Sequence, residues 1–145
     1  MGGRLAFVGP LGMDLGASLH TGVYDEENDL RVTLVGVDGR FAHRGFELKG
    51  EFVQANQKTA ADDLKKRGVY LQAAYLPVEW FKPAIRFSQM DFPGASNRDL
   101  REVSFGGSLY PPDLGALRVS YRVNKERSVT ETKNNQFIVQ FTVGF

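Results

Sequence analysis

The sequence predicts an all-β fold, an antiparallel up-and-down transmembrane β-barrel with about eight or nine strands in this chain. Three observations lead to this prediction. Apolar and polar residues alternate along many segments, turn-forming residues separate those segments, and an alternating segment with a terminal aromatic residue closes the chain. Alternation with a period of two is the pattern of a strand whose two faces meet different surroundings.

Length and composition bound the possible functions. The chain has 145 residues, enough for a complete small barrel or for part of a larger one. We therefore expect residues 1–145 to form a single β-barrel domain or the C-terminal part of a larger barrel. Cysteine is absent, which excludes disulfides and thiolate metal sites. The net charge is only +1, and the charged residues are scattered along the chain and form no basic block. We therefore expect no nucleic-acid partner.

The hydropathy of the chain excludes one way of crossing a membrane and permits another. No apolar run approaches the roughly 20 residues of a membrane-spanning helix. The strands of a membrane barrel carry only about 10 residues of alternation each, so a barrel stays possible. The segment Met1 to Leu5 has no apolar stretch after its charge. Because an exported barrel requires a signal peptide, we expect the natural protein to begin further upstream.

Nine strand-like segments follow one another. They are Gly3–Val8, Leu11–Tyr24, Val32–Ala42, Phe46–Gln57, Gly68–Val78, Pro83–Phe92, Arg101–Tyr110, Ala116–Glu126 and Asn135–Phe145. Short, turn-like connections follow the first, third, fifth and seventh segments, and three of the four contain Gly or Pro. Longer or more polar connections follow the others. Short turns on one rim and long loops on the other are typical of a membrane barrel.

The third segment, Val32–Ala42, contains Asp38-Gly39, a pair that could form a two-residue hairpin turn. Such a turn would leave too few residues for a strand before the next turn, so we place both residues inside the strand. The apolar residues before Gly36 lie at even positions, such as Val32 and Leu34, whereas those after it lie at odd positions. We expect a β-bulge near Gly36 as the cause.

Charged and apolar residues occupy opposite faces of the later segments. In Ala116–Glu126, for example, Val119 and Tyr121 oppose Arg118 and Arg122. With the apolar face toward lipid, the other face supplies the lining of a lumen, because charged groups in hydrocarbon are costly. The expected lumen-lining residues are Asp14, Asp38, Arg40, Glu47, Lys49, Glu51, Arg86, Glu102, Arg118 and Arg122, together with His20.

The charges of this set balance, with five acidic against five basic residues and His20 undecided. Strong ion selectivity requires a ring or ladder of one sign, and this balance gives no case for one. Pairing of opposite charges across neighbouring strands, which braces the wall, is the favoured interpretation.

The last segment alternates to its end. Its odd positions carry Phe137, Val139, Phe141, Val143 and Phe145, whereas most even positions are polar or small. This segment resembles the closing strand of bacterial outer-membrane β-barrels, whose terminal aromatic residue belongs to the signal read by the barrel assembly machinery. The resemblance implies that these five residues form an assembly signal. It also implies a location in the outer membrane, with outer-membrane lipid and the assembly machinery as partners.

A more specific resemblance covers most of the chain. Gly36–Phe41 followed by Gly45–Val53 is similar to a strand, turn and strand of the phosphate-selective porin O and P family, and so are Gly68–Tyr75, Lys82–Phe87 and Phe105–Pro111. The resemblance implies passive passage of small solutes or anions, phosphate among them, and a homotrimer. Members of the family have many more strands. Their phosphate-binding lysines have no match here, so only the fold and the general porin role are carried over.

Two other interpretations stay open. A small structural or adhesive outer-membrane barrel, with its lumen plugged by side chains, needs about 8 strands, whereas about 16 leave an aqueous channel. A soluble lipocalin-like binding barrel would turn the apolar face inward with the same alternation. The terminal Phe145 and the aromatic residues Trp80, Phe81 and Tyr110 near the expected rims favour the membrane barrel.

Catalysis is not expected. His20 with Asp14 or Asp38 could act as a base beside a serine, but no serine has an activating context. A single histidine among polar wall residues is more often structural. No His and carboxylate cluster has the spacing of a metal site, and no glycine-rich phosphate loop is present. We therefore expect a protein that is not an enzyme, with no catalytic residues, metal or cofactor.

Strand parity suggests that the chain belongs to a larger barrel. Single-chain bacterial barrels have an even number of strands, so both chain ends lie on one side. Nine segments would start the first strand at the opposite rim, and we expect the chain to be the C-terminal part of a larger barrel. The alternative is an eight-strand closure in which Gly3–Val8 leaves the wall and Leu11–Tyr24 pairs with Asn135–Phe145.

Overall fold

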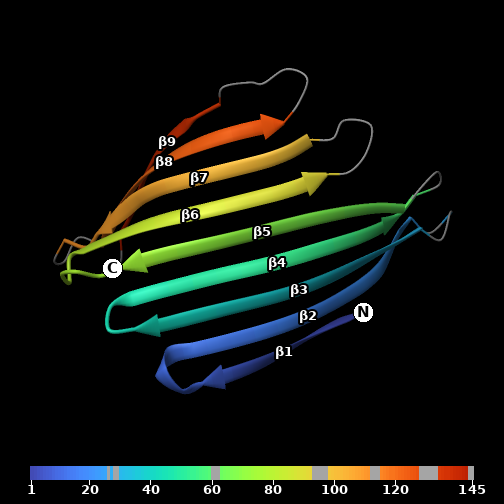
Figure 1. The fold of residues 1–145 in the computed structure, drawn as a ribbon, viewed down its shortest axis with the longest axis horizontal. Coiled ribbons are helices and arrows are strands. Elements are labelled where there is room, and N and C mark those ends of the chain that lie inside the picture. The colour runs from blue at the N-terminus through green and yellow to red at the C-terminus, as the bar shows by residue number, and fades with distance from the viewer. Residues whose placement is uncertain are drawn as a thin grey trace.

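The computed structural model describes residues 1–25, 27, 30–59, 63–92, 98–111, 115–127 and 134–143. These residues form one antiparallel sheet in which nine strands lie side by side in chain order (Figure 1). The strands are β1 (Gly2–Gly9), β2 (Met13–Asp25), β3 (Leu30–His43), β4 (Phe46–Lys58), β5 (Asp63–Tyr75), β6 (Phe81–Phe92), β7 (Arg98–Leu109), β8 (Ala116–Arg127) and β9 (Gln136–Thr142). A short 3-10 turn, η1 (Pro10–Gly12), joins β1 to β2.

The predicted all-β, up-and-down architecture is confirmed, because each of the nine expected segments coincides with one strand. Asp38 and Gly39 lie inside β3, as expected. The largest difference is at β5, which begins at Asp63 and not at Gly68. The residues between them are mostly charged, yet they continue the ladder with β4 as far as the pair of Lys58 and Asp63. The polar residues before Gly68 therefore belong to the strand, although their polarity on both faces suggested a loop.

The bulge expected near Gly36 is wrong. Gly36 lies opposite Ser18 on one side and Val53 on the other, within an unbroken register. The shift in the ladder between β2 and β3 lies instead between Val23 and Asp25. The change of apolar parity in β3 needs no bulge, because the charged face of the sheet itself becomes apolar toward that end of the strands.

The two ends of the strands form two rims. At the C-terminal rim, on the left of Figure 1, β9 ends and the connections 10–12, 44–45, 76–80 and 110–115 join the strands. At the N-terminal rim β1 begins, and segments 26–29, 59–62, 93–97 and 128–135 separate the strands. The connections alternate between the rims as expected. Their difference in length is smaller than expected, since several strands extend beyond the predicted bounds at the N-terminal rim.

The connection between β3 and β4 is a two-residue hairpin turn. Arg44 has φ 47° and Gly45 has φ 81°. Positive φ at both central residues defines the type I′ turn, whose twist matches that of paired strands. Glycine adopts such a φ without steric cost, which explains Gly45 at this position.

The outermost strands are β1 and β9. Strand β2 pairs with β1 on one side and with β3 on the other, so neither of its edges is available to β9. The eight-strand closure considered above is therefore not the arrangement of this chain. In the described part of the chain, the ladders join only consecutive strands, and none joins β1 to β9. Closure into a barrel stays a prediction.

The sheet is a single layer without a conventional hydrophobic core. Among the described residues, no large side chain is fully buried, and the most enclosed side chains are the small ones of Ala74 and Ser108, 4% and 8% exposed. No helix in the described ranges has the length and hydrophobicity needed to span a membrane. The position of the functional surface is therefore set by the two faces of the sheet.

Candidate functional site

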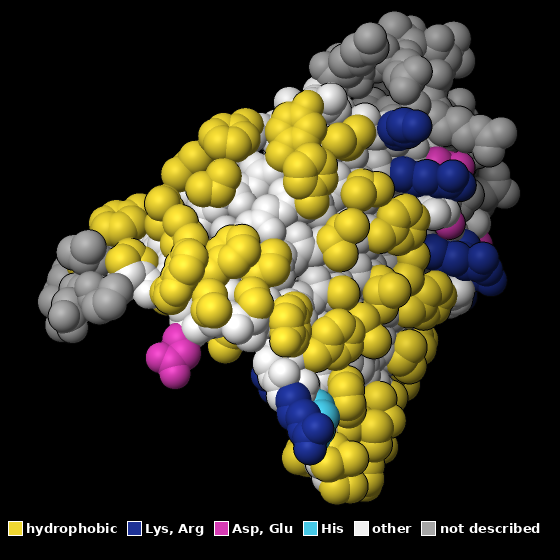
Figure 2. Space-filling model, turned by 60° about the vertical axis from the view of Figure 1, so that its left-hand side comes forward, with side chains coloured by type: hydrophobic (Ala, Val, Ile, Leu, Met, Phe, Trp, Pro, Cys, Tyr) yellow, Lys and Arg dark blue, Asp and Glu magenta, His cyan; other side chains and the backbone are white. Residues whose placement is uncertain are grey.

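One face of the sheet is apolar over most of its extent, from the C-terminal rim to Val69, Val103 and Val123. Directly opposed residues of an antiparallel pair project to the same face, so the register assigns side chains to faces. Phe105, for example, lies between Ile85 and Tyr121, and the rings of Phe105 and Tyr121 are 5.6 Å apart. Much of this face is exposed, with Phe137 at 68% and Phe105 at 52%. Figure 2 shows hydrophobic side chains covering most of this surface.

The opposite face is charged. Arg40 lies between Asp14 and Lys49, and Gln72 continues the same row between Lys49 and Arg86. The same register puts the ten acidic and basic residues predicted to line a lumen on this one face: Asp14, Asp38, Arg40, Glu47, Lys49, Glu51, Arg86, Glu102, Arg118 and Arg122. Their shared face is a structural fact, and their lining of a lumen stays a prediction.

A groove of about 390 Å³ runs over the charged face between β4 and β8. Ser104, Ser108 and Ser120 contribute hydroxyl groups to it. The charged side chains that line it are Glu47, Lys49, Lys82, Arg86, Arg118 and Arg122. Five cations thus share the groove with a single carboxylate. The ten charged residues predicted for this face balance in number but not in position. Most of the acidic ones lie on β2 to β4, whereas most of the arginines lie on β6 to β8.

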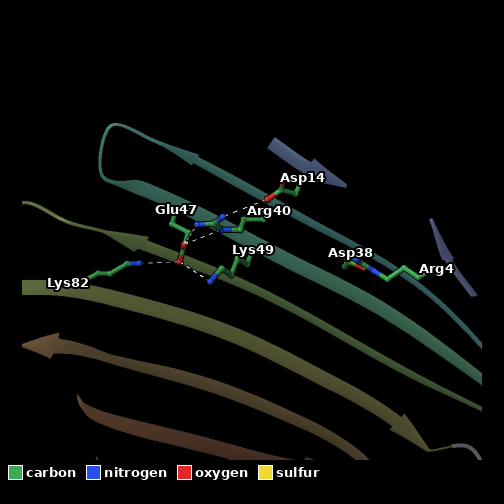
Figure 3. A network of polar contacts seen from close by, with 7 residues as sticks. All are labelled: Arg4, Asp14, Asp38, Arg40, Glu47, Lys49 and Lys82. Atoms are coloured by element: carbon green, nitrogen blue, oxygen red, sulfur yellow. Dashed lines mark hydrogen bonds and ion pairs between the residues drawn. The ribbon is translucent and has the colours of Figure 1, made fainter. Parts of the chain in front are cut away.

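Glu47 is the centre of an ion-pair network (Figure 3). Its Oε1 lies 3.1 Å from Nζ of Lys49 and 3.2 Å from Nζ of Lys82. Its Oε2 accepts a hydrogen bond from Nη2 of Arg40 at 3.1 Å, and Nη1 of Arg40 lies 3.7 Å from Asp14. The Glu47 side chain is only 12% exposed. The three cations surround a carboxylate that is largely shielded from water, and with Asp14 these contacts tie together strands β2 to β6.

The reach of this network depends on a small residue. Lys82 lies on β6 and Glu47 on β4, so their contact spans β5. The residue of β5 opposite Glu47 is Ala74, and Ala84 of β6 lies opposite Ala74. A longer side chain at position 74 would occupy the space through which the Lys82 ammonium reaches Glu47.

Arg4 and Asp38 repeat this arrangement beside the network, toward the β1 edge of the sheet. Nη2 of Arg4 on β1 lies 2.6 Å from Oδ2 of Asp38 on β3, so this pair spans β2. Gly16 of β2 lies between them, opposite Asp38 on one side and Ala6 on the other. A Cβ atom on Gly16 would lie 2.5 Å from Arg4 Nη2.

Two of the three arginines in the groove, Arg86 and Arg118, are held by neutral groups, whereas Nη1 of Arg122 lies 3.7 Å from Oε2 of Glu102. Arg86 lies over the ring of Tyr70 at 4.2 Å from its centroid and donates from Nε to Ser88. Arg118 donates from Nε to Ser108 at 3.4 Å. Neither guanidinium lies in an ion pair within the described residues. Both therefore present positive charge to the groove.

Sequence analysis missed several members of the charged face, among them Arg4 and Lys82. Arg4 shares even parity with Ala6 on β1, opposite to the apolar Leu5 and Phe7, so the alternation could have identified it. Lys82 was assigned to a turn, but β6 begins at Phe81 and places Lys82 opposite Ser108.

The combination of His20 with an aspartate, considered above as a possible base, is not formed. His20 and Asp14 lie six positions apart on one strand, a separation of about 20 Å. Asp38 is engaged by Arg4, and the neighbours of His20 across the ladders are Gly2 and Leu34. Across the described ranges, no group of three or more His, Asp or Glu side chains is positioned to hold a metal ion.

The predicted assembly-signal residues belong largely to β9. Phe137, Val139 and Phe141 project to the apolar face opposite Tyr121, Val119 and Leu117. Val143 follows the end of the strand and is 52% exposed, whereas Phe145 lies outside the described residues. Their recognition by an assembly machinery stays a prediction.

Aromatic residues gather at the C-terminal rim. The rings of Trp80 and Phe81 are 6.0 Å apart, and the backbone N–H of Tyr110 donates to the carbonyl oxygen of Trp80. Trp80 is 57% exposed and Tyr75 51%. Amphipathic rings in this position are typical of the boundary between a bilayer and water.

Comparison of the chain with known protein families, with curated proteins and with solved structures finds no match.

Proposed function

We propose that the chain forms the wall of a bacterial outer-membrane porin through which small anionic solutes pass. The observation that carries this proposal is the opposition of the two faces. One face exposes large apolar side chains over nearly all strands, and the other holds a groove lined by charge. An apolar surface of this extent is unfavourable in water and favourable against lipid. The charged face then supplies the aqueous path.

The alternative of a soluble binding barrel is less well supported. Such a barrel encloses its apolar side chains and leaves its charges outside. Here the small residues Ala74 and Ser108, the most enclosed in the sheet, lie on the charged face, and Phe105 and Phe137 on the apolar face are more than half exposed. A sheet that curls around its charged face is the arrangement that a membrane barrel uses.

The class of solute follows from the groove. Five cations and one carboxylate line it, and within the described residues neither Arg86 nor Arg118 has a carboxylate partner. Unpaired guanidinium groups beside serine hydroxyls attract anions and can donate several hydrogen bonds to them. A wall of this charge favours anions over cations, and the resemblance to phosphate-selective porins makes phosphate the first solute to examine.

The proposal is tested by conductance in planar bilayers. We expect the full chain, inserted in its assembled form, to conduct with a reversal potential that indicates anion preference in a salt gradient. Arg86→Gln together with Arg118→Gln should move the reversal potential toward zero. Arg44→Gln, in the hairpin turn outside the groove, should leave it unchanged. Correct insertion without conductance would contradict the porin role, and unchanged selectivity of the double variant would contradict the assigned solute class.

A further inference from the structure

We propose that four cations bordering the apolar face bind the anionic headgroups of membrane lipids. The four residues, here called the basic border, are Lys65, Arg67, Arg101 and Lys125. All four are exposed, and all four project to the apolar face of the sheet. The inference rests on the proposed membrane-spanning role and assigns a lipid partner to a surface away from the groove.

The basic border begins where the apolar side chains end. In β5, β7 and β8, the outward-facing residue next to the last apolar one toward the N-terminal rim is a cation. These neighbours are Val69 and Arg67, Val103 and Arg101, and Val123 and Lys125. Residues two apart on a strand share a face and lie about 7 Å from each other. The cations therefore stand at the depth where hydrocarbon gives way to headgroups.

Arg101 and Lys125 lie directly opposite each other on β7 and β8. Like charges in this position repel and destabilise the strand pair. Neither side chain takes part in an ion pair within the described residues. An anion placed between them would remove the repulsion, so this pair is the centre of the proposed site.

Other polar groups surround the pair. Gln89 of β6 lies opposite Arg101 and donates to Asp91 at 2.9 Å. Asp91 lies between Arg67 and Asp99, and both carboxylates are one row closer to the N-terminal rim than Arg101 and Lys125. Arg101 and Lys125 therefore lie next to the apolar side chains, and the acidic groups follow one row later, in the row of Arg67.

A lipid headgroup fits this position better than a passing solute. The basic border and the groove lie on opposite faces of the sheet, so a solute in the groove does not meet these cations. Figure 2 shows Lys and Arg side chains at the right-hand margin of the hydrophobic surface. Long cationic side chains can lay their methylene groups along apolar surface and extend their charge to the headgroups. Anionic phospholipid attracts each such charge.

The test measures lipid binding to the full chain in neutral detergent by native mass spectrometry. The variant Arg101→Gln with Lys125→Gln should bind phosphatidylglycerol more weakly than the unchanged chain, by about fivefold for each cation removed. Binding of zwitterionic phosphatidylcholine should change little. The matched control is Arg118→Gln with Arg122→Gln, which removes two cations from the other face and should bind phosphatidylglycerol as the unchanged chain does.

Equal binding of phosphatidylglycerol by the unchanged chain and the Arg101 and Lys125 variant would overturn the inference. So would displacement of the lipid by millimolar inorganic phosphate, which would identify a site for the free anion. The variant should retain the anion-selective conductance of the unchanged chain. Loss of conductance in the unchanged chain itself would contradict the proposed porin role, and it is distinguishable because lipid binding is measured in detergent.

Discussion

Arg4 and Asp38 form an ion pair across an intervening strand, with Nη2 of Arg4 2.6 Å from Oδ2 of Asp38. The side chains are 55% and 35% exposed, so the pair lies at the surface of the charged face. Contact at this distance is possible because Gly16, the residue of β2 between them, has no side chain. The contact ties β1, an outermost strand of the sheet, to β3 in addition to its ladder with β2.

The first prediction concerns Gly16. A Cβ at this position would lie 2.5 Å from Nη2 of Arg4 and 2.6 Å from Oδ1 of Asp38. Gly16→Val should therefore separate the pair and loosen β1. The backbone amides of β1 should then exchange hydrogen faster than those of β8 in the same variant. Gly3→Val is the matched control, because a Cβ on Gly3 meets nothing within 4 Å. Equal exchange rates in the two variants would show that the pair does not hold β1.

The second prediction concerns Glu47. Glu47→Gln keeps the shape of the side chain but leaves Lys49 and Lys82 without their counter-charge and Arg40 with Asp14 alone. We expect the free energy of unfolding to fall by about 2 kcal/mol, the loss typical of hydrogen bonds to a charged group. Denaturant titration measures it. Glu51→Gln serves as control, since Glu51 lies on the same strand and face and takes part in no ion pair within the described residues. A similar loss in both variants would contradict the role of the network.

The third prediction separates the two faces with adjacent residues. Phe87 projects to the apolar face of β6, and Ser88 projects to the charged face opposite Glu102. In a bilayer, Phe87→Lys should lower the free energy of unfolding by about 2–4 kcal/mol if the residue lies near the midplane. Ser88→Lys should cost much less, because it meets water and a carboxylate. Unfolding from lipid vesicles measures both, and the reverse order of the two losses would contradict a lipid-facing apolar surface.

The fourth prediction concerns the hairpin turn between β3 and β4. Gly45 has φ 81°, and an added Cβ would lie 3.0 Å from the carbonyl oxygen of Leu76. Gly45→Ala should lower the free energy of unfolding by about 1–2 kcal/mol, the cost of a left-handed conformation for an L-residue. Gly68→Ala is the control, because the nearest atom to its added Cβ, Met90 Cγ, is 4.0 Å away. Thermal unfolding compares the two, and equal destabilisation would argue against backbone strain at Gly45.

The alternation of residues by itself determined the strands and the division of the sheet into two faces. Val119 and Arg118 are neighbours in the chain, and a strand must send them to opposite sides. Their assignment to different faces therefore follows from local geometry alone. The ends of strands were less predictable, as β5 shows. The ladder with β4 continues to Asp63 because backbone pairing, which side-chain polarity does not encode, stabilises the charged residues before Gly68.

Only the tertiary structure decided which charges meet. The sequence contains Glu47 and Lys82, but 35 positions separate them, and the register of three strands brings their charged groups to 3.2 Å. Among the residues that the structure describes, the same register leaves Arg86 and Arg118 without carboxylate partners beside a groove. The acidic and basic residues are nearly equal in number in the sequence, but the fold gathers positive charge on β6 to β8. Contacts between strands depend on how the ladders are aligned, and that alignment is a property of the whole sheet, not of any one segment.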